Sequence, residues 1–125
     1  MNKRGIESFK GFTPKTILFC TEGALSIGVV VDNTGLSAGS DGKKILKAGT
    51  PIEGDLTNRT TAMKQAATKT NTIGILMDDV DVTDGKANAA VFVAGIIDLN
   101  KVDPTTAAMI DADVKAALPA VRFVK

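Results

Sequence analysis

The sequence predicts an α+β fold: a small antiparallel β-sheet or barrel-like domain with one helix in its C-terminal half and an extended N-terminal arm. Three observations favour this class. Short runs of β-branched residues are bounded by turn residues, Asp84-Gly85 is the dipeptide preferred in a two-residue hairpin turn, and a single capped helical pattern begins at Asp103. A length of 125 residues favours one domain.

The N-terminal part of the chain, residues 1–20, is expected to form the arm, and residues 21–125 the domain. Residues 1–15 contain four basic residues and one acidic residue, which gives this segment a formal charge of +3. Gly and Pro residues interrupt any helical or strand period in it. Three of the five phenylalanines lie at positions 9, 12 and 19, which favours docking on a partner; a frayed terminus is the alternative. The candidate partner contacts are Lys3, Arg4, Ile6, Phe9, Lys10 and Phe12.

The sequence of the first half of the domain predicts two strands separated by loops. Residues 26–31 form a β-branched strand that ends in a turn at 32–35, and residues 33–42 are rich in Gly, Ser, Asp and Thr, as in a loop. A short strand within 43–47 runs into a Gly/Pro turn at 48–51. Residues 54–65 are polar again and predict a long surface excursion.

The clearest strand pattern lies between residues 72 and 99. Residues 73–77 predict a buried strand, and residues 79–82 alternate between Asp and Val before the Asp84-Gly85 turn. A return strand follows through 91–94, meets a predicted bulge at Gly95 and continues to residue 99. The expected hairpin pairs are Val82 with Ala87, Asp81 with Asn88, and Val80 with Ala89.

One helix is predicted over residues 104–118. Asp103 can cap its N-terminus, Pro104 occupies the first helical position, and Pro119 stops the run. Apolar residues recur at helical spacing between these limits. A last short strand is predicted at residues 121–124.

Composition excludes several classes of function. The chain has no His, Trp or Tyr and a single Cys, at position 20, which argues against histidine base catalysis, imidazole metal sites and disulfide frameworks. A formal net charge of +1 argues against general nucleic-acid binding, and no apolar stretch is long enough for a membrane span. An export signal is not expected, and a single cysteine suits a reducing cytoplasm. We therefore expect a protein that is not an enzyme and binds no cofactor, nucleic acid or membrane.

Four aspartates within seven residues make a metal site worth testing. Counted from Asp79, the calcium-loop template needs Gly at its sixth position and Glu at its twelfth, where this chain has Asp84 and Ala90. We therefore interpret the cluster, which also contains Asp78 and Asp81, as a solvated strand face and turn. No metal site is expected.

Four segments follow one another in a recognisable order and spacing. They are residues 45–52 (ILKAGTPI), 74–76 (GIL), 79–85 (DVDVTDG) and 94–98 (AGIID). This succession, within residues 45–101, resembles tailed-phage head decoration and head-fibre proteins. The resemblance implies a small, β-rich structural protein, often trimeric, that is made in the host cytoplasm and sits on the outer capsid surface of the virion.

The resemblance also implies the partners. They are the major capsid protein and further copies of this chain in a homotrimer. The charge and extended pattern of the arm, not the resemblance, predict that the arm through Phe12 binds the capsid, and linked sites would strengthen the attachment. The candidate oligomer contact is Val91, Phe92 and Val93, because apolar side chains on both faces of one strand predict that both faces are covered. The alternative is a carbohydrate-binding module on the virion surface, against which the absence of Trp and Tyr counts.

Overall fold

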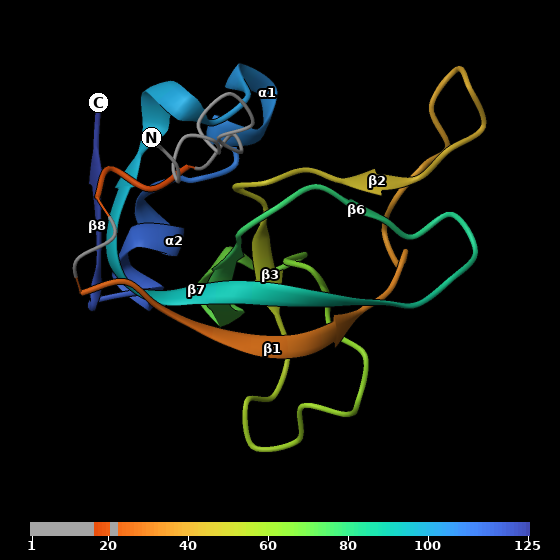
Figure 1. The fold of residues 1–125 in the computed structure, drawn as a ribbon, viewed down its shortest axis with the longest axis horizontal. Helices are drawn as coiled ribbons and strands as arrows, with labels where there is room; N and C mark the ends of the chain where they lie inside the picture. The colour runs from red at the N-terminus through yellow and green to blue at the C-terminus, as the bar shows by residue number, and fades with distance from the viewer. Residues whose placement is uncertain (1–16, 21–22) are drawn as a thin grey trace, which may run out of the picture.

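The computed structural model describes residues 17–20 and 23–125 of the chain. They form a mostly antiparallel β structure with two short α-helices, which confirms the α+β class (Figure 1). The six candidate arm contacts between Lys3 and Phe12 lie outside the described residues. None of the helices in the described ranges is long and apolar enough to cross a membrane.

One six-stranded sheet and one two-stranded ribbon contain all the named strands of the described residues. The sheet runs in the order β1-β7-β5-β3-β4, with β8 also paired to β7, and the ribbon joins β2 to β6. All pairs are antiparallel except β7 with β8. The elements are β1 (Leu25–Val31), β2 (Ile45–Leu46), β3 (Pro51–Glu53), β4 (Lys64–Gln65), β5 (Thr72–Leu76), β6 (Val80–Asp81), β7 (Ala87–Asp98), β8 (Val121–Val124), α1 (Pro104–Ala107), α2 (Ala112–Ala117), and the 3-10 helices η1 (Lys69–Asn71) and η2 (Leu99–Lys101).

The 12-residue strand β7 is the centre of the fold. It crosses the molecule beside β1 and then turns, so that its C-terminal part lies beside β8 (Figure 1). The turn coincides with two irregularities: Leu25 and Ser26 pair with Ala94 and Phe92, which leaves Val93 as an extra residue, and Gly95 has a φ of +129°. The bulge predicted at Gly95 therefore lies two residues earlier, and Gly95 supplies the unusual backbone angle beside it.

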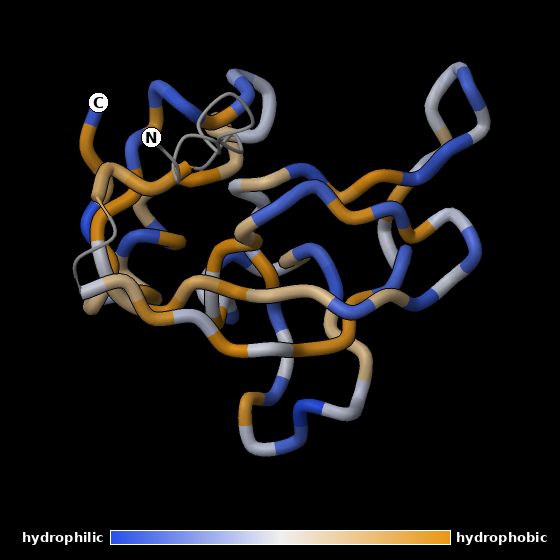
Figure 2. The backbone as a smooth tube through the Cα atoms, in the orientation of Figure 1, coloured by the Kyte–Doolittle hydropathy of each residue, from blue (hydrophilic) through white to orange (hydrophobic). Residues whose placement is uncertain are grey.

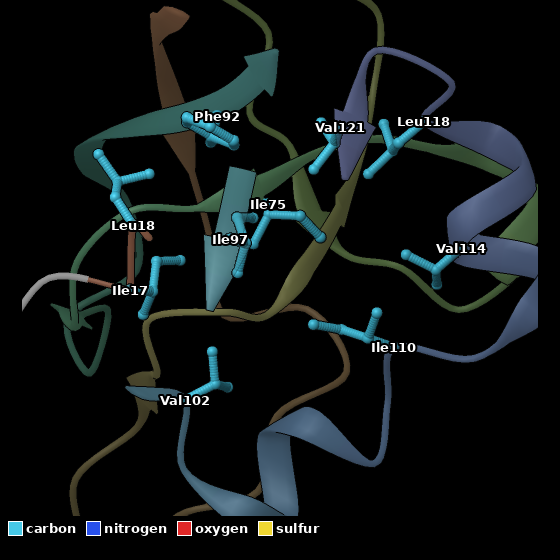
Figure 3. Close-up of a cluster of buried hydrophobic side chains, with 10 residues drawn as sticks. All are labelled: Ile17, Leu18, Ile75, Phe92, Ile97, Val102, Ile110, Val114, Leu118 and Val121. Carbon is cyan, nitrogen blue, oxygen red and sulfur yellow. The ribbon is translucent and has the colours of Figure 1, made fainter. Parts of the chain in front are cut away.

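Two hydrophobic clusters pack against β7. The first, drawn in Figure 3, contains Ile17, Leu18, Ile75, Phe92, Ile97, Val102, Ile110, Val114, Leu118 and Val121. The second contains Val29, Val31, Leu46, Ile52, Met63, Leu76, Val82 and Val91. The loops that project from the sheet are mostly hydrophilic (Figure 2). Because Val91 and Phe92 are neighbours on β7 and point to opposite faces, one strand supplies side chains to both clusters.

The predicted hairpin between residues 80–82 and 87–89 is wrong. Strand β6 pairs with β2, and β7 pairs with β1, where Ala87 lies opposite Val31. Burial explains the choice: Val82 is fully buried in the second cluster, and its backbone N–H donates to the carbonyl of Lys44 at 2.9 Å. The turn itself is closed by the N–H of Gly85, which donates to the carbonyl of Val82 at 3.0 Å, one residue earlier than predicted.

The single helix predicted over 104–118 is also wrong, because α1 and α2 are separate. The cap at Asp103 is confirmed, since its carboxylate accepts a hydrogen bond from the N–H of Thr105. Asp111 then interrupts the helix with an extended backbone and caps α2 by accepting from the N–H of Val114 at 3.1 Å. Both helices still present apolar residues to the first cluster, which is why the apolar spacing looked continuous.

The remaining elements were partly predicted. The bounds of β8 are confirmed, whereas its parallel pairing with β7 was not foreseen. Strands β3 and β4 were missed, because Pro51 was assigned to a turn and β4 lies at the end of the polar excursion. Pro51 is tolerated as the first residue of β3, where its carbonyl accepts from the N–H of Ala66 at 2.9 Å.

Candidate functional site

Residues 17–19, which we call the entry segment, lie along the edge of β7 that β1 also occupies. Leu18 forms an antiparallel bridge to Ile97, and the N–H of Phe19 donates to the carbonyl of Ile96 at 3.0 Å. The N–H of Asp98 donates to the carbonyl of Ile17 at 2.8 Å. The boundary predicted after residue 20 therefore falls inside the fold, and the entry segment belongs to the domain.

Packing also fixes the entry segment. Ile17 and Leu18 are 2% and 7% exposed, and both side chains point into the first cluster (Figure 3). The ammonium group of Lys101 donates to the carbonyl of Leu18 at 3.1 Å. Residues before Ile17 are thus joined to the domain at a fixed point on β7. The apolar run at 17–19 was the signal that sequence reasoning assigned to the arm.

Two large apolar side chains remain exposed beside the entry segment. Phe19 is 57% exposed and Leu25 is 58% exposed, and no other large hydrophobic residue in the described ranges is comparably exposed. Phe19 is bonded to Ile96, and Leu25 pairs with Ala94, so both flank the same short stretch of β7. We call Phe19 and Leu25 the entry surface. Paired exposed apolar side chains at one place favour a contact with another molecule.

A cleft of about 460 Å³ opens next to Ile17. Its charged side chains are mixed, with three aspartates and two lysines, and Asp79 is held there because its carboxylate accepts from the N–H of Ala48 at 2.7 Å. The cleft therefore has a weakly acidic wall where the chain enters the fold. Its lining residues are Ile17, Lys47, Ala48, Asp78, Asp79, Asn100, Lys101, Val102, Asp103 and Pro104.

Two of the four clustered aspartates, Asp79 and Asp81, accept hydrogen bonds from the backbone. Asp81 accepts hydrogen bonds from the N–H of Thr83 at 2.9 Å and from its hydroxyl at 2.6 Å. The hydroxyl bond first, and the backbone bond second, lower the pKa of Asp81. Within residues 17–20 and 23–125, no three side chains of the metal-binding types lie close enough to share an ion. Asp79 and Asp81 therefore fix local backbone geometry and do more than face solvent.

The three residues of the candidate oligomer contact differ in how deeply they are buried. Val91 and Phe92 have no exposed surface, because side chains of the chain itself cover both faces of β7. A neighbouring subunit cannot touch these two side chains in this conformation, and only Val93 keeps exposed surface. The prediction that both faces are covered is correct, but the covering residues come from the same chain.

The strongest electrostatic feature of the sheet is Glu53, at the end of β3. Its carboxylate accepts from the N–H of Ala67 at 2.9 Å and of Thr68 at 3.1 Å, and lies 3.5 Å from the ammonium group of Lys64. The Thr68 bond contributes most to lowering the pKa of Glu53 below its ordinary 4.5, and desolvation opposes the shift. The charged carboxylate therefore joins β3, β4 and the segment that follows β4.

Replacing Glu53 with glutamine is expected to destabilise the domain by on the order of 1 kcal/mol at neutral pH, because an ionised acceptor is replaced by a neutral one. A lowered folded-state pKa gives stability that is complete above the unfolded pKa and is lost as pH falls through the folded pKa. The difference between wild type and Glu53→Gln should therefore begin to shrink below pH 4.5 and vanish at lower pH. Urea unfolding across this range measures it.

The matched control is Lys64→Gln, which removes the ion pair and keeps both backbone hydrogen bonds. Lys64 is 40% exposed, so its loss should change stability little at any pH. A pH-independent difference between wild type and Glu53→Gln would show that the charge of Glu53 does not stabilise the fold.

Comparison with protein families and with curated proteins assigns no function to this chain, so a function has to be argued from its own residues. No protein-family model matches the chain, and no curated protein matches it.

Proposed function

We propose that this chain is a structural, non-catalytic protein that decorates the outer surface of a tailed-phage capsid. One observation carries the proposal: the chain enters the fold through a segment fixed on β7, directly beside two exposed apolar side chains, Phe19 and Leu25. The basic, phenylalanine-containing residues before Ile17 are therefore attached where the domain already offers an apolar contact. Docking on a shell protein would use the arm together with this apolar surface.

The resemblance of residues 45–101 to head decoration and head-fibre proteins supports the same function. The resembling segments coincide with parts of the scaffold: residues 45–52 contain β2 and the start of β3, residues 79–85 contain β6 and its turn, and residues 94–98 contain the bend of β7. Hydrogen bonds hold the carboxylates of Glu53, Asp55 and Asp81 to backbone N–H groups and lower the pKa of each one.

Multivalent attachment completes the proposal. A homotrimer would carry three docking regions, and linked sites raise the effective concentration of each contact. Val93, the one partly exposed residue of the predicted oligomer contact, is the position where a neighbouring copy could reach β7. Light scattering in solution and imaging of decorated capsids measure this part. A monomer under both conditions contradicts the trimer and leaves decoration by single copies.

Binding to emptied heads of the phage that encodes the chain tests the function. The full chain should co-sediment with the heads to saturation, whereas a chain lacking residues 1–10 should not bind. A double substitution, Arg122→Gln with Lys125→Gln, removes two positive charges from the other end of the chain and should bind normally. Undiminished binding of the truncated chain contradicts docking through the arm, and absence of binding by the full chain contradicts decoration.

A further inference from the structure

An open groove of about 540 Å³ lies over β1 and β7, away from the entry surface. Its floor is formed by the two strands, and its wall by the loop between β3 and β4, which projects beside β1 (Figure 1). Hydrogen bonds shape this loop: the N–H of Thr57 donates to Asp55, and the hydroxyl of Thr60 donates to the side-chain oxygen of Asn58. The lining residues are Gly28, Val29, Val30, Thr57, Asn58, Arg59, Thr60, Asn88 and Ala89.

Among residues 17–20 and 23–125, Arg59 is the one charged residue that lines the groove. Its guanidinium group donates to the carbonyl of Gly28 at 3.0 Å, which fixes the side chain against the edge of β1. One bond uses one of its five N–H donors, and Arg59 forms no ion pair with any residue that the structure describes. A guanidinium group held in this way is prepared for a planar anion such as a carboxylate.

The second observation that points to a ligand in this groove is the glycine at position 28. It interrupts the β-branched run of β1, although glycine weakens a strand. Its φ is not positive, and a Cβ added there would meet no atom within 4 Å, so neither the backbone nor the packing of this chain requires glycine. Its cross-strand partner on β7 is Ala90. A glycine in the interior of a strand leaves room for a ligand or another backbone to approach closely.

We propose that this groove binds an extended, acidic peptide segment of a partner protein. The peptide backbone passes over Gly28, beside Asn88, and one of its carboxylates forms a bidentate pair with Arg59. Asn88 and the side-chain amide of Asn58, whose oxygen already accepts from Thr60, can donate to the peptide carbonyls. A peptide fits better than a sugar, because no aromatic ring lines the groove among the residues that the structure describes, and better than a nucleic acid, because those residues give the groove one cation. The proposal holds whether or not the partner is a capsid.

The test is a titration of the full ¹⁵N-labelled chain with a capped glutamate hexapeptide, followed by NMR. Saturable shifts should be confined to amides of residues 28–30, 57–60 and 88–89. Arg59→Gln should raise Kd by about tenfold or more, because the ion pair is lost. Gly28→Val should raise Kd comparably by filling the floor, while its melting temperature stays at or above that of wild type. Arg122→Gln, which removes an exposed arginine on β8, should leave Kd unchanged.

Three outcomes would overturn the proposal. Shifts scattered over many basic residues, with Kd unchanged by Arg59→Gln and Gly28→Val, would show only diffuse charge attraction. Equal binding of a capped glutamine hexapeptide would show that the carboxylate is not recognised. Saturation of the groove by galacturonate oligosaccharides, but not by the glutamate peptide, would assign it to an acidic polysaccharide.

Discussion

Replacing Gly95 with alanine is expected to destabilise the domain by on the order of 3 kcal/mol. Two effects add. The φ of +129° is strained for any residue with a side chain, and the new Cβ would lie 2.5 Å from the Phe92 ring and 3.2 Å from the backbone of Ala24. Because Phe92 is fully buried in the first cluster, its ring has little room to move. Thermal and urea unfolding measure the loss.

Two other glycines separate the effects. Gly85 has a φ of +120° but open space around its Cβ position, so Gly85→Ala should cost only the backbone strain, about 1–2 kcal/mol. Gly28 has neither strain nor contact, so Gly28→Ala should leave stability unchanged or slightly raised. Equal costs at Gly95 and Gly85 would show that the ring of Phe92 moves aside freely.

Removing residues 1–19 is expected to destabilise the domain by about 3–5 kcal/mol, because two buried aliphatic side chains, Ile17 and Leu18, leave the first cluster. For a chain of this size the melting temperature should fall by about 10 °C or more. Removing only residues 1–10 should leave the melting temperature within a few degrees of wild type. Differential scanning calorimetry of the three chains measures both effects.

A point substitution tests the same contribution to stability in case the truncated chain does not fold. Leu18→Ala in the full-length chain keeps the main-chain bonds of the entry segment and should still cost about 3 kcal/mol. If Leu18→Ala and the 1–19 truncation both melt as wild type does, the entry segment does not stabilise the domain.

The parts of the fold that could be predicted are those in which local pattern and burial agree. The run that became β1 is β-branched and bounded by turn residues, and β8 lies between Pro119 and the last residue of the chain. Asp103 and Pro104 marked the start of a helix because capping chemistry is local. These features depend on residues that are neighbours in the sequence, so they can be predicted from a single sequence.

The wrong predictions concern segments whose structure is determined by contacts with residues that are distant in the sequence. Asp84-Gly85 does make a turn, but turn chemistry does not determine which strands pair on either side of it. Burial of Val82 beside Val31 and Leu46 determines that pairing, and those residues are far apart in the sequence. Asp111 was overlooked as a cap because the apolar period continues across it.

The candidate site was less predictable than the fold. The entry segment was assigned to the arm because its bonds go to β7, nearly eighty residues away in the chain. Arg59 lies in a polar stretch with no pattern of its own, and its meeting with Gly28 depends on how the loop folds back over β1. The exposed state of Phe19 and Leu25 likewise follows from tertiary packing alone.

The position of β7 along the chain sets the order in which a growing polypeptide can fold. β1, the entry segment, β5 and β8 all take β7 as a partner, and both hydrophobic clusters draw on it. During synthesis, residues 17–76 can pair β3 with β4 and β5, but β1 and the entry segment gain their strand partner, and both clusters are completed, only after residues 87–98 have emerged from the ribosome. Long-range pairing of this kind also slows folding. The newly made protein thus depends on its last third for protection from aggregation.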